Sequence, residues 1–162
     1  MSPTQPTKRI GEILLEKGLI SRNQLDQALA RQRASKEFLG EILVQLGAIR
    51  PEVLLDALSE QFHIPQEPLT VERVDWAVTK QFPASVFADG KCFPFRADET
   101  SVTVAIANPL DAWALSAVEE RSGFRKVRVV LVTDRELQTV LQAYRQRVLR
   151  NIGAMLRDDD TA

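Results

Sequence analysis

The chain contains one sequence unit twice, and this repeat constrains the fold more than any other feature. A shift of 29 residues aligns residues 38–61 with residues 9–32. The matched positions include glycines, aliphatic residues and a closing glutamine: Gly11 with Gly40, Leu14 with Leu43, Gly18 with Gly47, Leu25 with Leu54, Leu29 with Leu58, and Gln32 with Gln61. Such self-similarity indicates one supersecondary unit used in tandem.

Each copy is predicted to form a short helix, a tight turn and a second helix. In the first copy, apolar residues recur at helical spacing until Gly18, which suits a left-handed C-cap. Ser21 then opens the pattern of a capping box, with a glutamine three residues later. In the second copy, Gly47 takes the same turn position, and Pro51 suits the first position of the next helix. The repeat therefore predicts a four-helix layer over residues 9–61.

Two of the repeated glycines are not explained by turns. Gly11 and Gly40 are expected near the start of a helix, where glycine costs about 1 kcal/mol relative to alanine. We infer that something approaches the backbone there. The N–H groups and the dipole of a helix N-terminus favour an anion such as phosphate. Since the site occurs once in each copy, the pair of sites suits a ligand with two similar halves. Two copies are few for a solenoid, so the layer is expected to rest on other parts of the chain.

A different pattern follows a proline-punctuated linker, residues 62–70. Beyond two short helices, the expected elements are two strands, a helix, a third strand and a final helix, over residues 92–97, 101–107, 108–123, 126–132 and 134–149. This ββαβα order predicts a small α/β subdomain over residues 71–150, packed with the helical layer. The predicted fold class is therefore α+β. Residues 1–8 are expected to be disordered. Residues 151–162 are assigned as a C-terminal tail, whose acidic end RDDDTA at 157–162 is also expected to be disordered.

Composition excludes several classes of function. The 162 residues include 21 basic and 22 acidic side chains, so a net charge of −1 does not draw the chain to nucleic acid. The glycine-rich phosphate loop of nucleotide hydrolases does not occur. The single histidine, His63, and the single cysteine, Cys92, are far apart in sequence, so neither a nucleophilic pair nor a metal cluster is expected. We predict no catalytic residues, no cofactor and no metal.

Localisation signals are absent from the sequence as given. The N-terminus lacks the apolar run of a signal peptide, and no stretch reaches the roughly 18 to 20 apolar residues of a membrane span. The single cysteine, Cys92, lies in an apolar stretch and has no second cysteine with which to form an intramolecular disulfide, which fits a reducing compartment. We therefore expect a cytoplasmic protein without direct membrane insertion.

The segments RIGEILLEKGLI and FLGEILVQLGAI, together with NPLD at residues 108–111, resemble the MshEN domain. This is the N-terminal domain of type II secretion and type IV pilus assembly ATPases, and in that family the tandem motif binds cyclic di-GMP, a bacterial second messenger. The resemblance covers most of the chain. It implies a non-catalytic cyclic di-GMP receptor that takes one ligand per chain, with one half of the ligand on each copy. It also implies a protein partner in the secretion or pilus machinery, or another effector.

The resemblance assigns candidate ligand-binding residues. Gly11 and Gly40 would let the backbone approach the ligand. Gln32 and Gln61 would hydrogen-bond to the ligand or to the turns that hold it. The aliphatic residues expected to flank the purines are Ile10, Leu14, Leu25 and Leu29 in the first copy and Leu39, Leu43, Leu54 and Leu58 in the second.

Two charged residues complete the implied site. The Arg9 guanidinium would fork onto guanine, stack on it or pair with phosphate. Asp111 would accept hydrogen bonds from guanine N1 and N2. The second copy departs from the family pattern, because Phe38 stands where the first copy has Arg9. Phe38 can stack on a base but carries no charge, so affinity is expected to fall or the two halves to be held unequally, unless Lys36 compensates.

Other interpretations remain open from the sequence. Each aliphatic residue also suits a helical core, and either Asp111 or Asn108 suits a helix cap. The alternative function is a protein-docking adaptor of a type II secretion or type IV pilus assembly system that has lost or weakened nucleotide binding, and Phe38 favours it. DNA reading is disfavoured, because the second helices share no repeated basic face. The repetition of the whole pattern favours ligand binding over packing alone.

Overall fold

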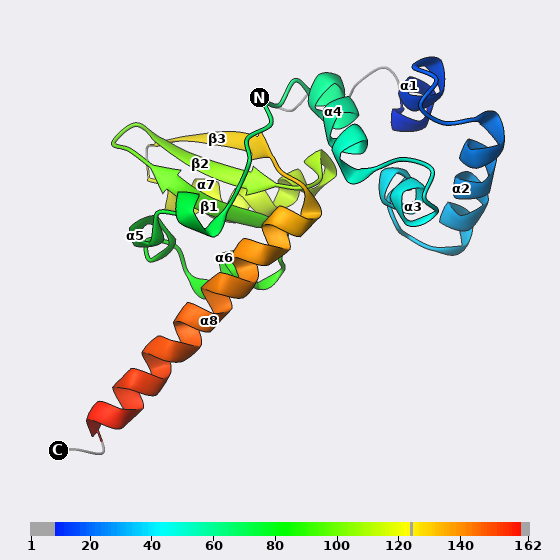
Figure 1. Cartoon of the computed structure of the whole chain (residues 1–162). Helices are drawn as coiled ribbons and strands as arrows, with labels where there is room; N and C mark the ends of the chain where they lie inside the picture. Colours follow the sequence, from blue (N-terminus) through cyan, green and yellow to red (C-terminus); the bar gives the residue numbers. More distant parts are fainter. Residues whose placement is uncertain (1–8, 124, 160–162) are drawn as a thin grey trace. The chain divides into compact units, whose positions relative to one another are not determined.

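The described chain forms two units with the α+β content that the sequence predicts. The computed structural model describes residues 9–123 and 125–159, and the boundary between its units lies between Gln66 and Glu67 (Figure 1). The predicted disorder of residues 1–8 lies outside the described residues. No helix in the described part of the chain is both long and apolar enough to cross a bilayer.

The first unit contains the tandem repeat. Its described helices are α1 (Ile10–Glu16), α2 (Arg22–Ala34), α3 (Leu39–Gln45) and α4 (Pro51–Phe62). The capping box is present at α2, because the Gln24 N–H donates to Ser21 Oγ over 3.1 Å and the Ser21 N–H donates to Gln24 Oε1 over 2.8 Å. Pro51 occupies the first turn of α4. The predicted helix-turn-helix is therefore confirmed in both copies.

Both copies turn by the same hydrogen-bond pattern. Gly18 and Gly47 adopt left-handed φ angles of 69° and 72°. In the second copy the Ala48 N–H donates to the Leu43 carbonyl over 2.9 Å and the Gly47 N–H to the Val44 carbonyl over 3.0 Å, and the first copy repeats both bonds. This Schellman arrangement satisfies carbonyl groups that a helix end leaves without intrahelical partners. The predicted role of the two turn glycines is confirmed.

The two copies bury one joint hydrophobic core. Helix α2 contacts α3, and α1 contacts both α3 and α4. An ion pair between Lys17 and Glu60 also joins α1 to α4. The buried core residues are Leu14, Ile20, Leu25, Ala28, Ile42, Leu43, Ile49 and Ala57. Two copies thus suffice to enclose a core, because the apolar stripes of the four helices face one another.

The second unit is built on a three-stranded sheet in the order β1-β2-β3. Strand β1 (Cys92–Ala97) pairs antiparallel with β2 (Ser101–Ile106), and β2 pairs parallel with β3 (Lys126–Leu131). Every residue of the central β2 is buried. The β1 register shifts between Pro94 and Arg96, and an edge strand with such an irregularity tolerates the missing N–H of proline. The predicted strands are confirmed, with ends within one residue.

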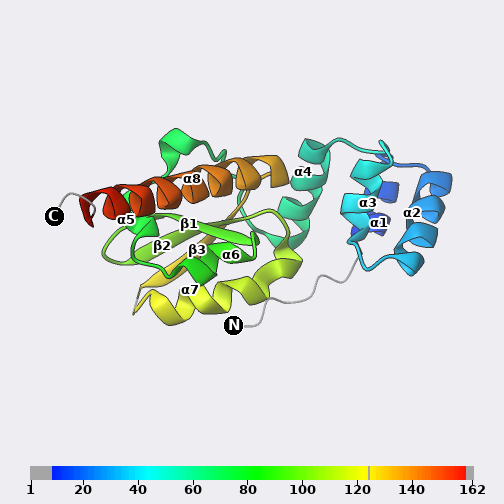
Figure 2. The same ribbon diagram turned by 90° about the horizontal axis from the view of Figure 1, so that it is seen from below.

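Helices cover the two faces of this sheet. The described helices are η1 (Val71–Arg73), α5 (Trp76–Thr79), α6 (Ala84–Ala88), η2 (Pro109–Ala114), α7 (Leu115–Arg121) and α8 (Asp134–Asp159). Figure 2 shows α8 along one face of the sheet and α7 on the opposite side. The sequence predicts one helix over 108–123, whereas the chain forms η2 and then α7. The Leu110 N–H donates to Asn108 Oδ1 over 3.0 Å, which tightens this first turn.

The C-terminal helix is longer than the sequence predicts. The predicted end lies near Leu149, whereas α8 runs unbroken through residues 151–159. The tail is therefore helical as far as Asp159, and residues 157–159, which are predicted to be disordered, belong to α8. Residues 154–157 are alanine, methionine, leucine and arginine, whose strong helix propensities outweigh the single Gly153. Residues 160–162 of the predicted tail lie outside the described residues.

The predicted linker, residues 62–70, is divided between the two units, with the boundary between Gln66 and Glu67. The Glu67 N–H donates to the Leu131 carbonyl over 3.2 Å. The Glu67 carboxylate accepts two hydrogen bonds from the Arg96 guanidinium, at 2.5 and 3.1 Å, and these bonds lower the pKa of that carboxyl. Leu69 is buried. The second half of the predicted linker therefore belongs to the sheet unit.

Candidate ligand-binding site

The two copies open their first helices with the same backbone geometry. Arg9 is the N-cap of α1 with φ −74° and ψ 151°, and Phe38 is the N-cap of α3 with φ −70° and ψ 141°. The Arg9 carbonyl accepts from the Ile13 N–H over 3.2 Å, and the Phe38 carbonyl accepts from the Ile42 N–H over 3.1 Å. Arg9 is exposed, and Phe38 is half-buried. A cation and an aromatic ring thus occupy one equivalent position.

Gly11 and Gly40 are each covered by a leucine of their own copy. A Cβ atom at Gly11 would lie 2.8 Å from Leu25 Cδ1, and a Cβ atom at Gly40 would lie 2.7 Å from Leu54 Cδ1. Both glycines are buried. The close approach that the repeated glycines predict is therefore made by the chain's own leucines, because the two helices of each copy cross at these points. This arrangement gives no support to an anion bound at the glycine backbone.

The predicted aliphatic residues divide into two groups by burial. Leu14 and Leu43 are 0% exposed and Leu25 is 6% exposed. These three side chains form core, so their burial gives no support to the role of flanking the purines, which stays a prediction. The half-buried members are Ile10, Leu29, Leu39, Leu54 and Leu58. Only this second group offers apolar surface to a ligand.

Gln32 holds the segment that joins the two copies. Its Nε2 donates to the Glu37 carbonyl over 3.3 Å. The neighbouring Arg31 donates to Gln45 Oε1 over 2.6 Å and lies 3.9 Å from the Glu37 carboxylate. Gln61, the equivalent residue of the second copy, is half-buried. Gln32 therefore supports the connecting segment, and its predicted contribution to ligand binding stays a prediction.

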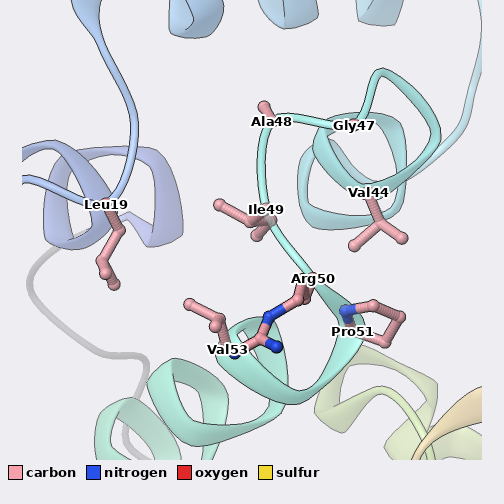
Figure 3. A pocket seen from close by; sticks show the side chains of 8 residues that line it. All are labelled: Leu19, Val44, Gly47, Ala48, Ile49, Arg50, Pro51 and Val53. Atoms are coloured by element: carbon pink, nitrogen blue, oxygen red, sulfur yellow. The ribbon is translucent and has the colours of Figure 1, made fainter.

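A surface pocket of about 390 Å³ lies where the turn of the second copy approaches Leu19 of the first (Figure 3). Its lining consists of Leu19, Val44, Gly47, Ala48, Ile49, Arg50, Pro51 and Val53. The walls are aliphatic except for the exposed Arg50. The sequence prediction does not include this pocket. Arg50 stands where the first copy has Ser21, and the sequence prediction does not use this difference between the copies.

Asp111 belongs to the second unit, where it lies in η2. It is 7% exposed, and burial raises the pKa of its carboxyl while the nearby charge of Lys91 opposes that shift. Asn108 supplies the side-chain cap of this turn, so the predicted capping role falls to Asn108. Leu110 and Trp113, on either side of Asp111, are 56% and 59% exposed. The aspartate thus sits in a shielded position beside exposed apolar side chains.

The single cysteine lies in β1 and the single histidine follows the end of α4. Cys92 is buried, and burial raises the pKa of its thiol to about 11, which leaves almost no thiolate at neutral pH. His63 ends α4 in a left-handed conformation with φ 54°. Over residues 9–123 and 125–159, no group of three or more histidine, cysteine, aspartate or glutamate side chains is placed to hold a metal ion.

Two solved structures share the fold. MshE, solved with cdg, superimposes with a TM-score of 0.72 at 24% sequence identity, over 85% of this chain and 99% of that one. The N-terminal domain of XpsE superimposes with a TM-score of 0.61 at 18% identity, over 83% of this chain and 92% of that one. The fold of this chain is therefore shared with proteins of known structure.

Sequence comparison identifies the family. Residues 62–151, more than half of the chain, match the MshEN domain, and the chain belongs to this family. The match begins at Phe62, the last residue of α4, so it falls mainly on the sheet unit. The sequence motifs that resemble the family, in contrast, lie mainly in the tandem repeat.

The curated relatives are much longer proteins. The type IV pilus assembly ATPase PilB of Thermus thermophilus is 34% identical over 118 residues, which cover 72% of this chain and 13% of PilB. The bacteriophage adsorption protein B of Escherichia coli K12 is 31% identical over 144 residues, which cover 89% of this chain and 19% of that protein. The chain thus spans only 13% and 19% of the lengths of these relatives.

Proposed function

We propose that this chain is a receptor domain for cyclic di-GMP and that its tandem repeat binds one ligand per chain. The observation that carries this proposal is the repeated backbone geometry at Arg9 and Phe38, 29 residues apart. A ligand with two similar halves suits a site with two equivalent positions. The fold shared with MshE, which was solved with cdg, supports the same ligand class.

The two halves of the ligand are held by different chemistry in this proposal. Arg9 is exposed and free to turn its guanidinium toward a guanine edge or a phosphate, which it can engage through two parallel hydrogen bonds. Phe38 offers only a ring face, so the second half is held by stacking and loses a charge-assisted hydrogen bond. The half-buried aliphatic side chains Leu29, Leu54 and Leu58 supply apolar surface for the bases. Affinity is therefore expected to be lower than with a cation at both positions.

We further propose that the domain is non-catalytic, needs no cofactor, and passes its ligand state to a protein partner. PilB is named as a type IV pilus assembly ATPase, and protein B is named for bacteriophage adsorption. A segment similar to this chain thus occurs in proteins of different activity, as expected for a regulatory module. We propose that this partner is a cytoplasmic protein of a secretion or pilus machinery.

The second candidate function is a docking adaptor with weakened or lost nucleotide binding. Two observations favour it: Phe38 stands where the first copy has Arg9, and η2 exposes the large apolar side chains of Leu110 and Trp113. Exposed aromatic and aliphatic side chains of this kind act as anchors in protein interfaces. In this case a protein partner binds without any nucleotide.

Isothermal titration with cyclic di-GMP, cyclic di-AMP and GTP separates the two candidates. The receptor proposal expects selective one-to-one binding of cyclic di-GMP, weakened about tenfold or more by Arg9→Ala, because a charge-assisted hydrogen bond contributes about 1.5 to 3 kcal/mol. Arg33→Ala, an exposed arginine in the last turn of α2, is the matched control and should leave affinity unchanged.

The predicted contribution of Asp111 to guanine recognition is tested in the same titration with Asp111→Asn. A selective loss of affinity for guanine-containing ligands is expected. If folded wild-type protein, verified by circular dichroism, binds none of the three nucleotides, the receptor proposal is wrong and the docking function takes its place.

A further inference from the structure

The C-terminal half of α8 carries an exposed apolar stripe. Its large side chains are between 49% and 69% exposed: Leu149, Ile152, Met155 and Leu156. With about 100° between successive residues, these four and Val148 fall within about 120° of the helix circumference, centred on Ile152. A contiguous exposed apolar surface on a helix indicates an interaction site.

The stripe continues the face by which α8 packs in its own unit. Leu141 is buried, and the Tyr144 ring stacks on Phe87 with the ring centroids 4.2 Å apart. Val148 is half-buried, and from Leu149 onward the same face is exposed in the described part of the chain. The apolar pattern therefore extends further along α8 than the surface that covers it.

A residue of opposite charge stands at each end of the apolar stripe, a basic one at the N-terminal end and an acidic one at the C-terminal end. Arg145 and Asp159 lie seven residues before and seven residues after Ile152, so both fall on the same face of α8. An antiparallel copy of the helix would place each Arg145 opposite an Asp159. A parallel copy would place like charges opposite each other. The charge pattern is thus self-complementary in the antiparallel orientation alone.

We propose that a second copy of this chain docks on the stripe, with the two α8 helices antiparallel and related by a twofold axis at Ile152. In this arrangement Ile152 faces Ile152, Leu149 lies beside Leu156 of the other copy, and Val148 lies beside its Met155. An Arg145–Asp159 ion pair closes the contact at each end. A twofold contact uses the same patch on both copies, which fits a stripe that complements itself.

The contact is short. It involves about four turns of each helix, which is small for a permanent interface, so the dimer is expected to depend on protein concentration. The inference does not rest on nucleotide binding, and a chain that binds no nucleotide would dimerise equally well.

Sedimentation equilibrium of the full chain over a range of concentrations tests the proposal. The wild-type chain should show a monomer–dimer equilibrium, and Ile152→Asp should be monomeric throughout. Arg145→Asp should weaken dimerisation about tenfold, because it replaces two attractive contacts by repulsive ones. Adding Asp159→Arg should restore wild-type association. Arg150→Asp, on a different face of the same helix, is the matched control and should change nothing.

Disulfide formation reports the orientation. Ile152→Cys should cross-link to its own copy, because the twofold axis brings the two residues together. Leu156→Cys should not, since its two copies would be separated by about 12 Å along the helix axis. The native Cys92 is 1% exposed and does not interfere. The proposal is overturned by a monomer at every concentration, by equal cross-linking at residue 156, or by a charge reversal that fails to restore association.

Discussion

The Cδ1 atom of Leu54 lies 2.7 Å from the position that a Cβ atom would take at Gly40, and its Cδ2 and Cγ atoms lie 3.2 and 3.5 Å from the same point. Leu25 covers Gly11 in the first copy in the same way, with its Cδ1 atom at 2.8 Å. The repeat therefore preserves a glycine–leucine contact between the two helices of each copy.

Gly40→Ala is expected to destabilise the protein by about 1 to 3 kcal/mol. The whole branched end of Leu54 must move to admit a methyl group, and this overpacking outweighs the gain of about 0.5 to 1 kcal/mol from better helix propensity. Urea unfolding measures the difference. Gly153→Ala in α8 is the control, because no atom lies within 4 Å of its Cβ position, and it should gain stability. Adding Leu54→Val to Gly40→Ala should recover part of the loss, and no recovery would contradict the contact.

Gly47→Ala is expected to cost about 1 to 2 kcal/mol for a different reason. The φ angle of Gly47 is 72°, a left-handed conformation that is unfavourable for residues with a Cβ atom, and no neighbouring atom lies within 4 Å of its Cβ position. The loss is therefore backbone strain and not a clash. Because asparagine tolerates this conformation, Gly47→Asn should lose less stability than Gly47→Ala in the same unfolding experiment. Equal losses in the two variants would argue against this origin.

Asp98 should contribute an acid-sensitive part of the stability. Its carboxylate accepts from the Thr100 N–H at 2.7 Å, the Thr100 hydroxyl at 2.9 Å and the Ser101 N–H at 2.7 Å. These hydrogen bonds lower the pKa of Asp98 from 3.8 to about 2. Because the folded-state pKa is depressed, the contribution is fully present above the unfolded value and is lost as the pH falls through the folded value.

Thermal melts between the two pKa values of 3.8 and about 2 test this linkage. The melting temperature of the wild-type protein should fall more steeply over this range than that of Asp98→Asn, which has no charge to lose. Glu99→Gln, at an exposed position in the same turn, should follow the wild-type curve. Parallel curves for wild type and Asp98→Asn would show that the carboxylate contributes nothing.

Phe38→Arg should raise affinity for cyclic di-GMP about tenfold if the receptor proposal holds. The substitution puts a guanidinium at the position equivalent to Arg9, and one charge-assisted hydrogen bond accounts for a change of this size. Titrations at two salt concentrations should show a steeper salt dependence for the variant. Lys36→Ala serves as the companion test, since a loss of affinity there would assign the compensating charge to Lys36.

Phe38→Leu completes this series, because it removes the aromatic ring but retains apolar character. A loss of affinity would support stacking by Phe38. An unchanged affinity in both Phe38 variants would mean that this position does not contact the ligand, whatever the result at Arg9.

The parts of the fold that depend on nearby residues are correctly predicted from the sequence. The capping box at Ser21, the left-handed turns at Gly18 and Gly47, and the ββαβα order all follow from short-range signals. Local propensity also indicates the helical continuation through 151–159, whereas the acidic composition of residues 157–162 predicts disorder. Composition was the weaker guide there, because residues 154–157 favour helix.

The sequence by itself determined that one helix-turn-helix unit is used twice, because a repeated spacing survives in the order of residues alone. Only the tertiary structure decided what the repeated residues do. It separates the buried Leu14 and Leu43 from the half-buried Leu29 and Leu58, although all four have the same helical periodicity. It also fills the space above Gly40 with Leu54. Burial and close approach depend on how helices distant in sequence cross, and no local pattern of residues specifies that crossing.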